Sequence, residues 1–439
     1  MASFQAGFLQ AGTASHIITP RIGYELTGYG NRPEVSTGVH DDLYARALVI
    51  SDGTTTVALC SVELLWLWTP LIAEIRQYAA QHCDIPAENI LIACTHTHAG
   101  PAPHQPENWQ TPLVQLIAEA IITASQRLQP VRIGFGFGQL FGYSINRRWL
   151  NRPVDPSVGV MRVDTADGQP LADGQPLAVV SNFGCHAVVL GYDNLMISGD
   201  WPGYSSRHLE AALPGCTALF MQGGAAEVNP LTETVRQRLA AGHPVGSMGN
   251  LDSSYGAYQH GAPDHWNIED RKGGTFLECE TLALAYNAEV MRVWRGISMD
   301  DTLPIGVTSL TVNGAADADE PPAEGVSPLY RRLLGDLPEG TLPLEIMVLR
   351  IGPAVFMTQP GEVFSETAVE FRKRAQQIGY RYPWLISYAN GSYAYLPPAN
   401  AFDEGGYEVA WARQVGLSRR LQDRITDAVF PILRQQITG

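Results

Sequence analysis

The sequence predicts an α/β fold in which large mixed β-sheets are flanked by helices. Short apolar runs rich in Val, Ile and Leu recur along the whole chain, which is typical of buried strands. Longer stretches with an apolar stripe at helical spacing alternate with them, and 45% of the 439 residues are hydrophobic, enough for a substantial core. No linker rich in Pro, Ser or Gly divides the chain cleanly. We therefore expect residues 1–439 to form a single domain.

The N-terminal part begins with a predicted hairpin, followed by a helix and a buried strand. Apolar runs at 45–50 and 55–62 flank Ser51-Asp52-Gly53-Thr54, which has the composition of a turn. A helix is expected over 69–82, because Pro70 suits a first helical turn. The run Ile90–Cys94 then predicts a buried strand.

The remaining elements follow from the same two patterns. Further strands are expected at 131–137, 158–164, 177–183, 217–222, 305–312, 345–351, 354–358 and 384–389, and helices near 112–128, 203–213, 363–378 and 411–437. Residues 231–275 are rich in Gly, His, Asp and Ser and show little periodicity. We expect them to form a long loop near the functional site, because ordered loops of this length are more often functional than idle.

Charge and cysteine content exclude several classes of protein. The net charge of −15 argues against a nucleic-acid or anionic-membrane surface, which needs clustered Lys and Arg. The six cysteines form no CxxC pair, so neither a disulfide framework nor a cysteine metal site is expected. No apolar stretch approaches the roughly 18 residues of a membrane span, and the N-terminus does not resemble a signal peptide. We expect a soluble, cytoplasmic protein with a small-molecule substrate; a signal removed before residue 1 would leave no trace, and a homo-oligomer is compatible with the sequence.

The most informative motif is Cys94-Thr95-His96-Thr97-His98-Ala99-Gly100-Pro101, directly after a predicted strand. If the strand continues, its alternation places His96 and His98 on one face, at the end where α/β folds bind ligands. A His-x-His pair can present two imidazoles to one zinc ion, or one to a metal and one to substrate. Two hydrogen-bonded histidines without a metal are the alternative.

Other polar residues stand at the ends of predicted elements. His186 follows an apolar strand and is either a core histidine or a ligand. Asp200 is either a helix N-cap or a carboxylate that orients a ligand histidine. Glu362 precedes a helix and could simply favour its N-terminus through the macrodipole. Tyr395 and Tyr407 lie twelve residues apart in a region rich in Gly and Pro, where tyrosines are commonly packing residues.

Taken in order, these motifs resemble the neutral/alkaline, non-lysosomal ceramidase family, specifically its N-terminal catalytic domain. The resemblance spans nearly the whole chain. It rests on Thr27-Gly28-Tyr29-Gly30, residues 38–47, residues 95–101, Asn146-Arg147, His186, Ser198-Gly199-Asp200, Pro360-Gly361-Glu362 and residues 390–407.

The resemblance implies a hydrolase with one zinc ion per chain. By position, four residues are implied as zinc ligands: His96, His186, Glu362 and Tyr395. Three more are implied to lie around the scissile amide: His98, Arg147 and Tyr407. Zinc would activate a water molecule as nucleophile and polarise a carbonyl, although His, Glu and Tyr also accept other divalent ions.

The chain departs from the family's pattern in two respects. The family's catalytic serine aligns with Asn229 in Ala226-Glu227-Val228-Asn229-Pro230, and an amide can hydrogen-bond a substrate but cannot act as a hydroxyl nucleophile. Members of the family also carry a C-terminal immunoglobulin-like domain, and we expect this sequence to correspond to the catalytic domain alone.

We therefore expect a zinc-dependent hydrolase of a soluble amide or N-acyl compound, in which metal-activated water is the nucleophile. One alternative is the same metal site acting on an ester, lactone or glycosidic linkage. The other is a non-catalytic binding protein of the same fold.

Overall fold

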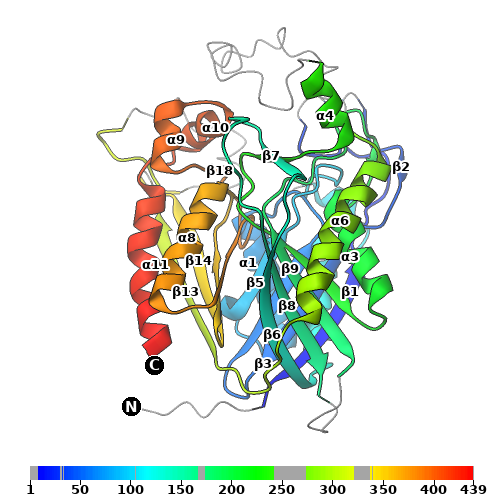
Figure 1. Ribbon diagram of the computed structural model, residues 1–439, viewed down its shortest axis with the longest axis vertical. Helices are drawn as coiled ribbons and strands as arrows, with labels where there is room; N and C mark the ends of the chain where they lie inside the picture. The colour runs from blue at the N-terminus through cyan, green and yellow to red at the C-terminus, as the bar shows by residue number, and fades with distance from the viewer. Residues whose placement is uncertain are drawn as a thin grey trace.

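Two β-sheets pack face to face, and helices cover the outer face of each sheet (Figure 1). This computed structural model describes residues 8–438, apart from 30–31, 33, 104, 167–173, 242–272, 321–336 and 339. The larger sheet has the strand order β11-β9-β8-β6-β1-β3-β4-β5, and the smaller sheet has the order β13-β14-β15-β17. Both sheets are mixed, which confirms the predicted α/β class with helices flanking mixed sheets.

The larger sheet contains eight strands, of which only the pairs β4·β5 and β9·β11 are parallel. Their bounds are β1 (Gln10–Ile17), β3 (Tyr44–Ser51), β4 (Thr56–Val62), β5 (Ile90–Cys94), β6 (Gln129–Gln139), β8 (Ser157–Thr165), β9 (Pro176–Phe183) and β11 (Thr217–Gln222). Strand β1, which the apolar pattern did not predict, pairs with β3 over its whole length. The sheet curves strongly enough for the Ser61 hydroxyl on β4 to donate to the carbonyl of Phe220 on β11, at 2.6 Å.

The smaller sheet is formed by the C-terminal strands. These are β13 (Ile305–Asn313), β14 (Pro343–Ile351), β15 (Ala354–Thr358) and β17 (Tyr382–Ile386). Three short ladders join loops above the sheets: β2 (Gly38–Val39) with β10 (Met196–Ile197), β7 (Ser144–Asn146) with β12 (Val228–Pro230), and β16 (Glu362–Val363) with β18 (Tyr395–Leu396).

The helices form the two outer layers and one end of the molecule (Figure 1). Helices α1 (Thr69–His82) and α2 (Leu113–Ser125) pack on the β3–β5 half of the larger sheet, and α3 (Asp200–Ala212) and α6 (Phe276–Arg295) pack on its β8–β11 half. Helices α8 (Ser365–Ile378) and α11 (Leu421–Thr438) cover the smaller sheet. The short helices α4 (Glu233–Ala240), α9 (Ala399–Glu404) and α10 (Tyr407–Val415) lie at the upper end in Figure 1.

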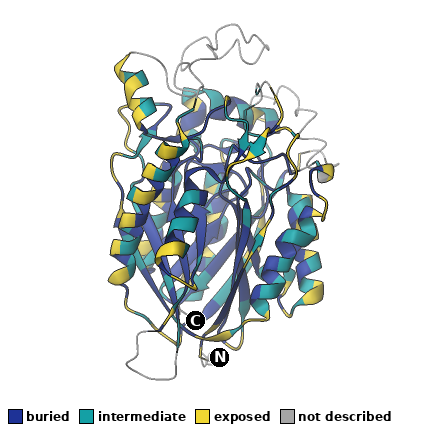
Figure 2. Ribbon diagram, turned by 90° about the vertical axis from the view of Figure 1, so that its right-hand side faces the viewer, coloured by how far each residue is buried: buried dark blue, intermediate teal, exposed yellow. Residues whose placement is uncertain are grey.

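Side-chain alternation along the strands divides the core into layers. On β4, Val57 and Leu59 face the layer between the two sheets, whereas Ala58, Cys60 and Val62 face α1 and α2. Figure 2 shows the result: most strand residues are buried, except along β13, and exposed residues lie on the outer faces of the helices and on loops. Residues of both sheets share the central apolar layer, as a single domain requires, although the domain organisation itself stays a prediction.

Three expectations need correction. The helix predicted over 411–437 is two helices, because Gly416 takes a left-handed conformation (φ 84°) and ends α10. Helix α6 was not predicted, although Thr275 and Glu278 form a capping box at its start. The loop predicted over 231–275 is partly helical, since α4 begins after the N-cap Thr232; residues 242–272 lie outside the described part of the chain. None of the described helices is long and apolar enough to cross a membrane.

Candidate active site

The candidate site lies beyond the carboxyl ends of three strands. His96 follows β5, His186 follows β9 and Glu362 follows β15. Strand β5 ends at Cys94, and His96 adopts a left-handed conformation with φ of 68°, so the expected continuation of the strand through His98 is wrong. A turn, held by the Leu64 carbonyl that accepts from the His96 amide at 3.0 Å, brings the two histidines together instead.

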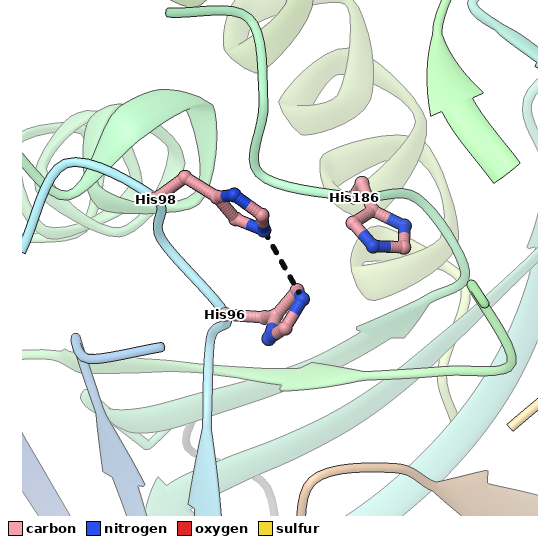
Figure 3. A group of neighbouring side chains, drawn as sticks. All are labelled: His96, His98 and His186. Carbon is pink, nitrogen blue, oxygen red and sulfur yellow. Dashed lines mark hydrogen bonds between the residues drawn. The ribbon is translucent and has the colours of Figure 1, made fainter. Parts of the chain in front are cut away.

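Three imidazoles gather at this point (Figure 3). The Nε2 atoms of His96 and His98 lie 3.2 Å apart, and one nitrogen from each of His96, His98 and His186 falls within 4.8 Å of the others. The turn after β5 and the segment after β9 are joined by a bridge between Thr97 and Ala187. Among the described residues, this is the cluster of histidine and acidic side chains in which ligand atoms converge closely enough for a metal ion.

The tautomers of two of these rings follow from their hydrogen bonds. His96 Nδ1 lies 2.8 Å from the Leu65 carbonyl, and His186 Nδ1 lies 2.6 Å from the Ala225 carbonyl. A carbonyl only accepts, so each Nδ1 carries the proton and each Nε2 offers a lone pair. Burial lowers the pKa of both rings to about 3, and at His96 the Glu362 carboxylate opposes this effect. Both imidazoles are therefore neutral at physiological pH, the form that binds metals.

Glu362 faces these lone pairs directly. Its Oε2 lies 3.1 Å from His186 Nε2 and 3.6 Å from His96 Nε2. A carboxylate oxygen and a bare imidazole nitrogen are both acceptors, so the contact is favourable only with a cation or a proton between them. Burial raises the pKa of Glu362, against the effects of His96 and Arg147. Because the side chain points into the cluster, it does not serve the α8 macrodipole, the alternative raised by the sequence.

The other implied residues adjoin the cluster as a second group. Arg147 Nη2 donates to the Tyr395 hydroxyl at 3.0 Å, and Nη1 donates to Asn229 Oδ1 at 3.5 Å. The Tyr395 hydroxyl is hydrogen-bonded to Glu362, which links this group to the histidines. The ring of Tyr407 packs edge-on against that of Tyr395, with centroids 5.4 Å apart.

Asp200 supports the backbone after His186. Gly199, not Asp200, is the N-cap of α3. The Asp200 carboxylate accepts from the amides of Val189 and Leu190 at 3.3 and 3.0 Å, and burial raises its pKa to about 6. The residue thus positions the segment that carries His186 rather than the imidazole itself.

Sequence reasoning gave no role to Tyr388, which lies between His96 and Glu362. Its ring stacks on His96 with centroids 3.9 Å apart, and its hydroxyl donates to Glu362 Oε2 at 3.3 Å. Tyr388 and Asn390 both have positive φ (52° and 61°), so the chain after β17 bends sharply into the site. Asn390 was a visible signal of that bend, because asparagine tolerates the left-handed region.

The motif Thr27-Gly28-Tyr29-Gly30 supplies residues that pack on His98. The Tyr29 and His98 rings have centroids 5.0 Å apart. Gly28 has φ of 103°, and a Cβ atom there would lie 2.4 Å from His98 Nδ1. Arg32 Nη2 donates to the His98 carbonyl at 2.9 Å. Gly28, Tyr29 and Arg32 therefore fix the position of His98.

A cavity of about 420 Å³ opens onto the cluster, a size suited to a small ligand. His96, His98, Glu362, Tyr395 and Tyr407 line it, together with the aromatic side chains of Tyr29, Trp66, Trp68 and Trp411. Among the described residues, the charged side chains that line this cavity away from the cluster are Glu25, Glu34 and Arg32. The Arg32 guanidinium donates to backbone carbonyls, including those of Leu26 and Asn194, so its hydrogen-bonding groups are largely used within the protein.

The fold and the site together define a two-sheet α/β protein with a histidine–carboxylate cluster at the strand ends. Residues 10–226 match the family described as neutral/alkaline non-lysosomal ceramidase, N-terminal. The chain is 28% identical to neutral ceramidase A of Dictyostelium discoideum, over 51% of this chain and 36% of that protein. It is 27% identical to the neutral ceramidase of Mycobacterium tuberculosis, over 45% of this chain and 35% of that protein.

Solved structures show the same fold. A ceramidase complexed with C2 superposes with a TM-score of 0.71 and 18% identity, covering 98% of this chain and 75% of that one. The neutral ceramidase of Pseudomonas aeruginosa gives a TM-score of 0.70 with 19% identity and the same coverage. The resemblance to the neutral/alkaline ceramidase family that the motifs predicted is thus confirmed. The matched region spans about a third of the length of these curated relatives.

Proposed function

We propose that this protein is a zinc-dependent hydrolase that cleaves the amide bond of a soluble N-acyl compound, with water as the nucleophile. One observation carries the proposal. The His186 Nε2 lone pair faces Glu362 Oε2 at 3.1 Å, while His186 Nδ1 is committed to a backbone carbonyl. Two buried acceptors in contact fit a cation held between them, and this arrangement is common in metal sites.

The donor set suits zinc. His96, His186, Glu362 and Tyr395 supply nitrogen and oxygen donors of the kind that zinc accepts in catalytic sites. His98 Nε2, 3.2 Å from His96 Nε2, is a further donor within reach. When bound, zinc would supply Lewis acidity toward a carbonyl oxygen and would activate water.

The surrounding residues have chemical roles that fit amide hydrolysis. His98 and Tyr407 line the cavity, where an imidazole or a phenol can pass a proton to the departing amine. Arg147 provides a fixed positive charge behind Tyr395, which favours negative charge developing on the substrate oxygen. Asn229 accepts from Arg147 and in this proposal orients its guanidinium.

The comparisons support an amide bond as the target, because the relatives named above are ceramidases. The cavity of about 420 Å³ with aromatic walls favours a small N-acyl compound with a planar or apolar acyl group. An ester, lactone or glycosidic substrate at the same metal site is the second candidate, favoured by the same aromatic and polar lining.

The first test is the metal content of the purified protein, measured by inductively coupled plasma mass spectrometry after zinc is added and the excess removed. We expect about one zinc per chain in the wild type and a loss of most of it in His186→Ala and Glu362→Ala. His208→Ala is a matched control, because His208 is a partly exposed histidine that pairs with Glu280 and does not belong to the cluster. No bound zinc in the wild type would favour the non-catalytic binding protein and refute the proposal.

The second test compares amide, ester and glycoside substrates that share one acyl or aryl group. Zinc-dependent release from the amide supports the proposal, and release from the ester or glycoside alone favours the second candidate. Asn229→Ala is expected to lower turnover while zinc stays bound. The reason is that the Asn229 side chain contacts Arg147 and not the atoms proposed to bind zinc. Zinc loss in Asn229→Ala would contradict this assignment.

A further inference from the structure

Glu408 lies behind the site, in the first turn of α10. Two glycines, Gly405 and Gly406, precede this helix with φ of 70° and 91°, and this turn directs Tyr407 to the cavity and Glu408 away from it. The Glu408 side chain is 1% exposed, so its charge needs partners within the protein. Its position in the chain lies outside every motif that pointed to the site.

Glu408 bridges two consecutive buried arginines. Its Oε1 accepts from Arg147 Nε at 2.9 Å, and its Oε2 accepts from Arg148 Nη1 at 2.8 Å. Arg148 has other acceptors, since its Nη2 donates to the Gly405 carbonyl at 2.9 Å and pairs with Glu404 at 3.3 Å. Among the hydrogen bonds described for the Arg147 guanidinium, only the one to Glu408 is made to a carboxylate, and the others are made to the neutral Asn229 and Tyr395.

Removing this carboxylate would leave Arg147 buried beside one other negative charge. Glu362 acts electrostatically on Arg147, and the Tyr395 hydroxyl is hydrogen-bonded to both. A buried guanidinium without its counter-ion turns toward the nearest carboxylate, because an unpaired charge in the interior is costly. An Arg147–Glu362 pair would occupy the carboxylate that the proposed zinc ion requires.

We infer that Glu408 is a positioning residue, which holds Arg147 against Tyr395 and thereby keeps the guanidinium from pairing with Glu362. The inference rests on the zinc site of the proposed function. Two neighbouring residues at the start of α10 then have different roles: Tyr407 lines the cavity, and Glu408 fixes the position of the Arg147 guanidinium.

The test is a double-mutant cycle on zinc affinity, measured by competition with a chromogenic chelator. Glu408→Gln is expected to weaken zinc binding about tenfold or more, the usual scale for residues that support metal ligands. In the Arg147→Met background, the same Glu408→Gln change is expected to alter zinc affinity by less than about threefold, because the competing cation is gone. An equal loss in both backgrounds would mean a general structural role and would overturn the inference.

Glu404→Gln is the matched control. Glu404 pairs with Arg148 and Arg152 but has no described bond to Arg147, so its neutralisation should leave zinc affinity and kcat near wild type. Glu408→Asp keeps the charge and shortens the side chain by one methylene, so it should fold even if the glutamine variant does not. It should show a smaller loss of zinc affinity, and this loss should again disappear in the Arg147→Met background. Zinc binding by wild type and Glu408→Gln alike would refute this inference alone, whereas a wild type that binds no zinc would refute the proposed function as well.

Discussion

Glu362→Gln distinguishes a metal site from a simple ion pair, because the two arrangements predict opposite effects on the metal-free protein. With His186 neutral and its Nε2 bare, the carboxylate at 3.1 Å is an acceptor facing an acceptor. A glutamine amide there can donate to that nitrogen, so the metal-free variant should be at least as stable as the wild type. If His186 were instead protonated and paired with Glu362, the same change would destabilise the protein.

The magnitudes are separable. A new buried hydrogen bond contributes about 1 kcal/mol net, so metal-free Glu362→Gln should range from equal stability, where Glu362 already holds a proton, to about 1 kcal/mol more stable. Loss of one partner of a buried ion pair costs about 3–5 kcal/mol. Zinc at a hundredfold excess over Kd should stabilise the wild type by about 2.7 kcal/mol, and a variant with about hundredfold weaker binding by only about 0.4 kcal/mol. For 439 residues, an unfolding entropy of about 2.1 cal/mol/K per residue converts 1 kcal/mol to about 1 °C in Tm.

Scanning calorimetry at one scan rate, with a chelator or with zinc, measures all four states. Glu63→Gln is the control, because Glu63 is a buried carboxylate paired with Arg46 and its side chain has no described contact with the histidines. That variant should lose at most about 3–5 kcal/mol, because Arg46 keeps Glu210 as a second partner, and the loss should be the same with or without zinc. A metal-free Glu362→Gln protein that melts several degrees below wild type, the result expected for Glu63→Gln, would refute the reasoning about the bare imidazole.

Three other outcomes are expected. Gly28→Ala should lower kcat about tenfold or more, because the added Cβ would displace His98. Gly23→Ala is the control, since Gly23 has a similar φ of 95° but its added Cβ would meet no atom within 4 Å, and kcat should stay near wild type. Equal losses of kcat in the two variants would point to backbone strain alone. Burial raises the pKa of Glu227 to about 7, so the contribution of this side chain to stability falls as pH rises from about 4.5 to 7. Over that range, urea titrations should show the free energy of unfolding of the wild type falling by about 3 kcal/mol relative to Glu227→Gln. The same pH dependence in both proteins would contradict the pKa shift. Because Glu25 and Glu34 line the cavity with exposed carboxylates, an N-acyl glycine should react about tenfold more slowly in kcat/KM than the matched N-acyl ethanolamine, and equal rates would exclude this electrostatic selection.

The strands were predictable because each carries its own local signal. The apolar run 217–222 coincides with β11, and the turn at 51–54 lies between β3 and β4 as expected. Helix α6 carried an equally local signal, the Thr275–Glu278 capping box, which was overlooked beside a segment of low periodicity. The end of α10 also has a local signal, the glycine at position 416. It was not used because the apolar stripe continues on both sides of Gly416 and predicted one long helix.

The site was predictable in composition but not in geometry. The alternation argument placed His96 and His98 together for the wrong reason, since a left-handed turn rather than a strand joins them. Tyr388 and Glu408 went unassigned because their importance comes from contacts made across the fold, with His96 and with Arg147. Local patterns show which residues end a strand. They do not show which distant side chain completes a hydrogen-bond network.

The side chain of Asn229 constrains the proposed chemistry. It lies on β12, opposite Ile145 of β7, and its Oδ1 faces the guanidinium of Arg147. An amide has no ionisable proton, so it can orient a cation but cannot form an acyl intermediate through its own oxygen. In the proposed reaction, water is therefore the nucleophile, and proton transfer falls to His98 and Tyr407, which line the cavity. A serine at this position would add a second nucleophile, whereas asparagine reserves the position for holding Arg147.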